Sequence, residues 1–165
     1  MTINVAVVGL GKMGISHLGI VNALKDFNVV AICDSSTLVG EVIEKYGKLH
    51  YVSKYDDLFE MKDLHAVIIA TPTTAHEPMV RKALEHGLHV LCEKPLTLSA
   101  AESEALALLA ESKGLIGQVG YHNRYIGTFS EVKRLLDIGA IGKVSQIEDL
   151  KPYLIANKAT TVVVR

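Results

Sequence analysis

Short apolar runs alternate with segments of helical spacing over the first 120 residues of the chain. The runs cover residues 3–8, 29–33, 66–70, 88–92 and 115–119, and each predicts a strand. The continuous run 66–70 is typical of a strand covered on both faces of a sheet. Between them, apolar residues three and four apart predict helices near 15–24, 38–46, 77–86 and 99–112, with a brief strand at 51–52 and a helical turn at 55–60. Strands separated by helices imply right-handed crossovers. The pattern predicts an α/β fold with a doubly wound parallel sheet.

Local signals support one of these helices in particular. Ser99 stands at the predicted N-cap of the helix that ends at Ser112, and Glu102 follows three residues later. This spacing predicts a capping box, in which the two side chains satisfy each other's backbone N–H groups.

The pattern changes after Gly120. Residues 126–138 predict a helix, 143–149 a strand, and 160–164 form a β-branched run at the end of the chain. About 45 residues are too few for an independent core, and an apolar edge strand needs a sheet to join. We therefore expect residues 121–165 to be the start of a truncated second α+β domain.

The first predicted strand runs directly into Gly9-Leu10-Gly11-Lys12-Met13-Gly14, and a helix follows. This order turns a common glycine pattern into a dinucleotide-binding fingerprint. Gly9 permits a tight turn, Gly11 lets the backbone approach a pyrophosphate, and Gly14 lets the helix pack closely on the strand. The helix N-terminus then points unpaired N–H groups at the phosphates, so Lys12 and Met13 join the candidate cofactor-binding residues.

An acidic residue at the end of the second strand selects the cofactor. Asp34 lies 20 residues past Gly14, at the distance from which a carboxylate accepts hydrogen bonds from a ribose 2′-hydroxyl and repels a 2′-phosphate. A glycine-rich turn that only joins a strand to a helix would not need this acid. The sequence predicts a Rossmann dinucleotide-binding domain over residues 1–120 that binds NAD rather than NADP.

Composition excludes several other classes of protein. The chain has 165 residues, of which 49% are hydrophobic, and its net charge of −1 supplies no field that would gather nucleic acid or an anionic membrane. The N-terminus enters a strand directly, so we expect no cleavable signal and a cytoplasmic location. Cys33 and Cys92 each end a predicted buried strand and are expected to be reduced core residues. Neither lies in a metal-ligand spacing, so no metal site is predicted.

Polar clusters follow three of the later strands, at the edge where parallel sheets bind ligands. They are Thr71-Pro72-Thr73-Thr74-Ala75-His76, Glu93-Lys94-Pro95-Leu96 and Gly120-Tyr121-His122-Asn123-Arg124-Tyr125. With the glycine fingerprint in front of them, these segments resemble the glucose–fructose oxidoreductase / inositol dehydrogenase / rhizopine-catabolism family, Gfo/Idh/MocA. The resemblance runs from Ile3 to about Ile147.

That resemblance implies a nicotinamide-dependent dehydrogenase acting on a sugar, a cyclitol or a similar polyol. In the family the lysine of the E-K-P segment lies near the nicotinamide and the substrate hydroxyl, which makes Lys94 the candidate catalytic residue. A lysine placed there could transfer a proton or stabilise a developing alkoxide. The bond before Pro95 is often cis in the family.

Other residues take roles from the same resemblance. Thr71 and Pro72 would line the ribose–nicotinamide half of the cofactor, with Glu93 and Lys94 nearby. His76 is a cofactor-binding candidate, although a capping or packing role explains it equally well. The candidates for substrate binding are Tyr121, Asn123 and Arg124, and Arg124 could instead pair with an acid at the domain junction. The histidines without an assigned role are His17, His50, His65, His86 and His89.

The chain departs from the family at its C-terminal side. Complete members are roughly twice as long, and in many the second domain supplies an aspartate and a histidine, four residues apart, that complete the catalytic site. No Asp-x-x-x-His follows Arg124 here. We expect a fragment of a longer enzyme, or one completed by a partner chain, with homo-oligomerisation through the C-terminal segment. The alternative is a non-catalytic NAD-binding sensor or regulatory module derived from the family.

Overall fold

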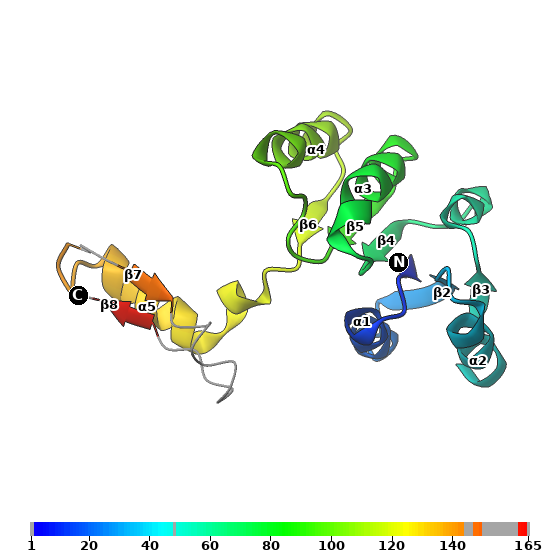
Figure 1. Ribbon diagram of the computed structural model, residues 1–165, viewed down its shortest axis with the longest axis horizontal. Coiled ribbons are helices and arrows are strands. Elements are labelled where there is room, and N and C mark those ends of the chain that lie inside the picture. The colour runs from blue at the N-terminus through cyan, green and yellow to red at the C-terminus, as the bar shows by residue number, and fades with distance from the viewer. Residues whose placement is uncertain (1, 48, 144–146, 150–161, 165) are drawn as a thin grey trace. The chain divides into compact units, whose positions relative to one another are not determined.

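The computed structural model describes residues 2–47, 49–143, 147–149 and 162–164 (Figure 1). Its internal contacts divide the chain into two compact units, Met1–Tyr121 and His122–Arg165. Each unit is described by itself.

The first unit is built on one six-stranded parallel sheet. In spatial order its strands are β3 (His50–Val52), β2 (Phe27–Cys33), β1 (Ile3–Val8), β4 (Ala66–Ile69), β5 (His89–Cys92) and β6 (Gly117–Val119). The order reverses between β1 and β4, which creates the switch point where dinucleotides bind in such folds. This confirms the predicted doubly wound α/β architecture.

Helices cover both faces of this sheet (Figure 1). On one face lie α1 (Lys12–Asn22) and α2 (Thr37–Gly47), and on the other α3 (His76–Glu85) and α4 (Ala100–Ser112), with the 3₁₀ turns η1 (Tyr55–Glu60) and η2 (Thr73–Ala75) in the connections. Alternate strand residues feed two apolar cores. In β1, Val5 and Val7 pack toward α1, whereas Ala6 and Val8 pack toward the core under α3 and α4.

Backbone hydrogen bonds align the residues that follow neighbouring strands. The Gly9 N–H donates to the Cys33 carbonyl and the Glu93 N–H to the Ile69 carbonyl, both at 2.8 Å. The Gly120 N–H donates to the Cys92 carbonyl at the same distance. The chain segments that carry the predicted chemistry therefore emerge at one edge of the sheet.

The predicted capping box forms only in part. The Ser99 hydroxyl accepts a hydrogen bond from the Glu102 N–H at 3.4 Å, as expected for an N-cap. The Ser99 N–H, however, donates to the Thr97 hydroxyl at 3.2 Å. A threonine two residues before the helix thus takes the place predicted for the Glu102 side chain, because a short side chain reaches this N–H from within the turn.

The second unit contains η3 (His122–Tyr125), α5 (Gly127–Asp137), β7 (Ile147–Asp149) and β8 (Val162–Val164). The two strands pair with each other in an antiparallel sheet. From the sequence we expected β8 to need a sheet to join, and β7 supplies one neighbouring strand. The remainder of the predicted strands, residues 144–146 and 160–161, lies outside the described residues.

Both cysteines are buried and free, as predicted. Burial, with the nearby Asp34 and Asp57 carboxylates, raises the pKa of the Cys33 thiol to about 12. Burial and the neighbouring Glu93 do the same for Cys92. Among the described residues there is no group of His, Cys, Asp and Glu side chains that could hold a metal ion, and no helix with the length and apolar character needed to cross a bilayer.

Candidate functional site

A groove of about 650 Å³ opens at the carboxyl edge of the sheet. Before α1 and in its first turn, the lining residues are Gly9, Gly11, Lys12 and Met13. Asp34 and Ser35 line the groove after β2, and Thr71 and Pro72 line it after β4. The structure therefore brings together the glycine loop, the acid and the threonine segment. Gly14, His76, Glu93 and Lys94 do not line this groove.

Two of the three fingerprint glycines are required by packing inside the protein. Gly9 has a φ of +88°, and a Cβ there would lie 2.8 Å from the carbonyl carbon of Ala70. A Cβ on Gly14 would lie 1.7 Å from the Gly9 carbonyl oxygen. Helix α1 thus approaches the turn at Gly9 more closely than any side chain would allow.

The third glycine faces open space. A Cβ on Gly11 would meet no atom within 4 Å, and Gly11 lines the groove. As the N-cap of α1 it offers no capping side chain, and the first turn contains no acidic residue. The first N–H groups of a helix have no partner within the helix, and its positive dipole end attracts anions. This end of the groove fits the pyrophosphate of a dinucleotide.

The carboxylate of Asp34 is held rigidly in the groove. Its Oδ2 accepts a hydrogen bond from the Leu10 N–H at 2.5 Å, and its Oδ1 accepts one from the Ser36 N–H at 2.7 Å. The Tyr51 hydroxyl donates to the Asp34 carbonyl at 2.9 Å. A carboxylate offers about four acceptor positions, so Asp34 retains capacity for the hydroxyls of a ribose.

The wall beside Thr71 is formed by Tyr55 and Met79. The Tyr55 hydroxyl donates to the Met79 carbonyl at 2.9 Å, and burial raises the pKa of Tyr55 well above its usual range. The Thr71 hydroxyl donates to the Met79 sulfur at 3.5 Å, and a thioether sulfur is a weak acceptor. The Thr71 hydroxyl could therefore exchange this contact for a better one with a ligand.

Glu93, Lys94 and Pro95 form a turn after β5. Glu93 is only 7% exposed, whereas Lys94 is exposed, and the Lys94–Pro95 peptide bond is cis, as the family resemblance implies. The Glu93 Oε1 lies 2.8 Å from His17 Nε2, and its Oε2 accepts a hydrogen bond from the Lys94 N–H at 3.1 Å. The predicted cofactor residue Glu93 thus has partners within the protein.

These partners decide the charge state of Glu93. Burial alone would raise its pKa, but the hydrogen bonds from His17 and the Lys94 N–H, with Coulombic attraction to both residues, lower it below its ordinary value of 4.5. Glu93 is therefore a buried carboxylate that stays ionised at neutral pH.

We expect Glu93 to make the stability of the chain more sensitive to acid. A group whose pKa is lowered by folding stabilises the fold above its unfolded pKa, and this contribution is lost as the pH falls through the folded pKa. Between about pH 6 and about pH 3 the wild-type chain should lose more free energy of unfolding than Glu93→Gln. Urea unfolding followed by circular dichroism measures both, with Glu104→Gln on the exposed side of α4 as control. Equal losses in wild type and Glu93→Gln would contradict the lowered pKa.

His76 lies beneath the groove rather than in it. Its side chain is 1% exposed, and its Nδ1 and Nε2 lie 2.8 Å and 2.9 Å from the carbonyl oxygens of Pro95 and Thr71. The ring therefore ties the turn after β5 to the segment after β4. A neutral imidazole donates from only one nitrogen, so both contacts are donor bonds only in the imidazolium form.

The sequence analysis missed His17, which does not line the groove but contacts the predicted residue Glu93. It also missed Tyr55 and Met79 of the groove wall, for which the sequence offers no local signal. His17 follows Gly14 by one helical turn, and residues three apart share a face of a helix. Since Gly14 faces the strand ends, that spacing was the available signal. Three of the other histidines have contacts within the protein: His65 and His89 each accept a backbone N–H through Nδ1, and the ring of His86 stacks on Phe59. His50 is exposed.

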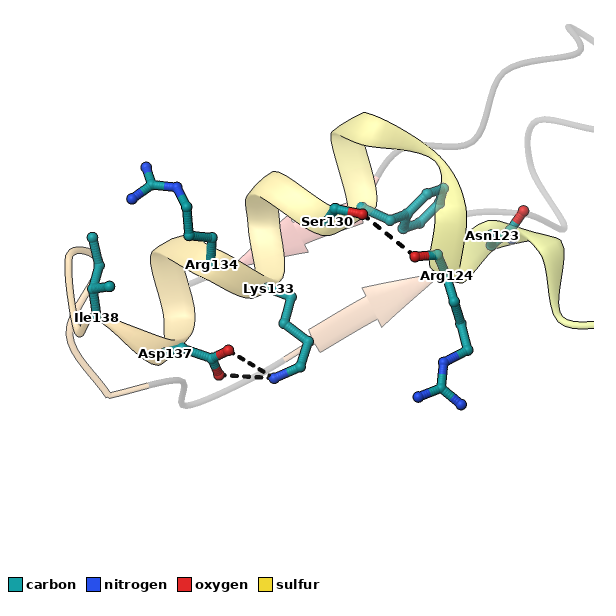
Figure 2. Close-up of a pocket in the computed structure, with 8 residues that line it drawn as sticks. Asn123, Arg124, Ser130, Lys133, Arg134, Asp137 and Ile138 are labelled. Atoms are coloured by element: carbon teal, nitrogen blue, oxygen red, sulfur yellow. Dashed lines mark hydrogen bonds and ion pairs between the residues drawn. The ribbon is translucent and has the colours of Figure 1, made fainter.

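The predicted substrate residues fall in different units. Tyr121 is 48% exposed at the end of the first unit. Asn123 and Arg124 belong to the second, where they help to line a hollow of about 590 Å³ along α5 (Figure 2). There the Ser130 hydroxyl donates to the Arg124 carbonyl, and Lys133 pairs with Asp137 at 2.8 Å. The substrate role of these residues stays a prediction.

Comparison with known proteins identifies the family. The profile of the Gfo/Idh/MocA oxidoreductase family, described by its NAD-binding Rossmann fold, matches residues 3–121. The chain belongs to this family. Residues 3–121 therefore form an NAD-binding Rossmann domain.

Proteins similar to this chain include enzymes named for different activities. The chain is 36% identical over 142 residues to scyllo-inositol 2-dehydrogenase (NAD⁺) of Bacillus subtilis, covering 84% of this chain and 41% of that protein. It is 32% identical over 143 residues to 2,7-anhydro-N-acetylneuraminate hydratase of Mediterraneibacter gnavus, covering 87% and 38%. A crystal structure of scyllo-inositol dehydrogenase from Lactobacillus casei with bound NAD(H) and scyllo-inositol matches with a TM-score of 0.81 at 25% identity, covering 98% and 51%. The chain thus spans about half or less of the length of these relatives.

Proposed function

We propose that the chain is the N-terminal, cofactor-binding part of an NAD-dependent dehydrogenase that oxidises a cyclitol, sugar or related polyol. The observation that carries the proposal is the groove in which the open face of Gly11 and the fixed carboxylate of Asp34 lie together. The relatives named for NAD and for inositol support both the cofactor and the substrate class.

Different residues of the groove would bind different parts of the cofactor. The N-terminal N–H groups of α1 and the open surface at Gly11 would receive the pyrophosphate, and Asp34 would accept hydrogen bonds from the adenosine ribose. Thr71 and Pro72 would line the remaining half. When bound, NAD⁺ supplies the acceptor for the hydride that leaves the alcohol carbon.

Lys94 would handle the proton of the same reaction. As the alcohol carbon loses its hydride, the hydroxyl oxygen gives up its proton to Lys94 Nζ, and the product is a ketone. In the reverse direction the Lys94 ammonium returns this proton to the carbonyl oxygen. A positioned side chain of this kind is a general base in one direction and a general acid in the other.

The second unit would begin the domain that selects the substrate. Tyr121, Asn123 and Arg124 stand at the passage from the first unit to the second. In the proposed function they face the polyol, and the segment beyond them forms the substrate and oligomerisation domain. The relatives are about twice as long as the chain, which leaves room for the rest of that domain. We propose a cytoplasmic homo-oligomer without nucleic-acid or membrane partners.

The selectivity for NAD(H) tests this proposal directly. We expect NADH to bind about tenfold or more tightly than NADPH, the equivalent of ~1.4 kcal/mol, because the Asp34 carboxylate would face the extra phosphate. Asp34→Asn removes the charge and should narrow the difference between the two affinities, because it relieves the repulsion of the NADPH phosphate and weakens the hydrogen bonds to the ribose of NADH. Fluorescence titration with both cofactors measures all four affinities.

Asp26→Asn is the matched control, since Asp26 directly precedes β2, at the end of the strand opposite Asp34. It should retain the wild-type preference. Equal affinities of the wild-type chain for the two cofactors would refute the role given to Asp34, and no binding of either would refute the proposed function.

A further inference from the structure

The turn that carries Lys94 is fastened on both sides. Before Lys94, the Glu93 carboxylate is held by His17 of α1 and by the Lys94 N–H, at 2.8 Å and 3.1 Å. After Lys94, the Pro95 carbonyl lies 2.8 Å from the buried His76 ring. Lys94 itself is exposed between these two attachments.

The space around Glu93 is closed from a third direction. A Cβ on Gly120, at the end of β6, would lie 3.2 Å from the Glu93 Oε1. A glycine at this position therefore lets the chain after β6 pass close to the carboxylate. Helix α1, the turn after β5 and the end of β6 all meet at this buried group.

Burying a carboxylate to hold a turn is energetically unfavourable compared with burying an apolar side chain. Removing a charge from water is unfavourable unless the charge is paired, whereas an apolar residue of similar size would avoid that penalty. The Glu93 charge is retained with a partner from a distant helix, His17, whose side chain is 19% exposed. His17 belongs to α1, the helix whose first turn lines the groove, so the contact with Glu93 links the groove to the turn that carries Lys94.

We infer that His17 and Glu93 form a positioning pair that couples the cofactor-binding helix to Lys94. Gly11 and His17 lie on the same short helix and its cap, so whatever fixes the N-terminus of α1 also fixes His17. His17 then orients Glu93, and Glu93 holds the backbone of Lys94. The Nζ of lysine lies at the end of a four-carbon stem, so a change in the direction of the Cα–Cβ bond displaces the region that Nζ can reach. The inference rests on the proposed function, in which Lys94 acts beside the bound cofactor.

The test observes Lys94 itself and does not depend on enzyme activity. The full chain is labelled with [ε-¹³C]lysine, and Lys94→Arg assigns the Lys94 resonance. We expect NADH to shift this resonance in wild type and to shift it by less than half as much in His17→Ala. NADH affinity in His17→Ala should stay within about threefold of wild type, because His17 does not line the groove.

A conservative variant separates positioning from general packing. Glutamine at position 17 carries an N–H₂ group that can donate to the Glu93 carboxylate, so His17→Gln should restore most of the Lys94 response. Glu93→Gln should weaken the response as His17→Ala does. His50→Ala, at an exposed histidine on β3, should behave as wild type.

The outcomes distinguish the inference from the proposed function. If His17→Ala lowers the stability but leaves the Lys94 resonance and its response unchanged, His17 is only structural and the inference is wrong. If wild type binds no NADH, the proposed function fails. The inference is then tested on the free protein: a shift of the Lys94 resonance in His17→Ala supports it, and an unchanged resonance contradicts it.

Discussion

Replacing Gly11 with valine is expected to abolish binding of NADH and NADPH while the first unit stays folded. Gly11 has an extended conformation, with φ −68° and ψ −174°, which a β-branched residue adopts readily. Its Cβ would meet no protein atom within 4 Å and would project into the space proposed for the pyrophosphate. Fluorescence titration measures the binding, and circular dichroism with urea unfolding measures the fold.

Gly14→Ala is compared with Gly11→Val, because it adds a smaller side chain at a position where the protein itself leaves no space. Its Cβ would lie 1.7 Å from the Gly9 carbonyl oxygen, so α1 must move away from the sheet. We expect it to lower the free energy of unfolding by about 1–3 kcal/mol or more. A folded Gly11→Val protein that binds NADH normally would overturn the interpretation of the fingerprint.

The sequence was sufficient to predict the fold of the first unit. Continuous apolar runs mark strands covered on both faces, and β4 and β5 were predicted within one residue of their observed ends. The glycine fingerprint identified the turn at Gly9 and the contact at Gly14, since both depend on a local approach of backbone to backbone. Asp34 could be found by its spacing alone, and the structure places it in the groove.

The partners of the E-K-P turn could not be predicted in the same way. His17 and Glu93 lie 76 positions apart, and only the packing of α1 against the ends of the strands brings them together. His76 was equally compatible with a cofactor contact and a packing role, and its two bonds to carbonyl oxygens depend on the path of the turn at Pro95. The Thr97 contact with the Ser99 N–H also lies outside the pattern of a capping box.

The same distinction applies to the second unit. Its helix α5 was predicted from apolar spacing, because that signal is local. The pairing of β7 with β8 was not, because a pattern of β-branched residues predicts strands but not their neighbours. Roles that depend on a second domain, such as those of Asn123 and Arg124, are set by residues that no local pattern in this chain supplies.

Lys94→Ala is expected to lower turnover by ~10² or more in the longer protein or assembly that completes the site, with little change in NAD⁺ affinity. The reason is geometric. Lys94 lies on the turn after β5, whereas the groove that would hold the cofactor is lined by the glycine loop, Asp34 and the segment after β4. Steady-state kinetics with an inositol as substrate give kcat, and fluorescence titration gives the affinity for the cofactor. Lys25→Ala, which replaces an exposed lysine between α1 and β2, is the control and should behave as wild type.

A second substitution at Lys94 separates proton transfer from charge. Arginine retains the positive charge but does not give up its proton in a protein, so Lys94→Arg should be nearly as slow as Lys94→Ala if Nζ exchanges a proton with the substrate. If Lys94→Arg instead keeps most of the activity, the side chain acts by charge alone. Loss of NAD⁺ binding in Lys94→Ala with turnover retained at saturating cofactor would make Lys94 a cofactor anchor, and the proposed proton transfer would be wrong.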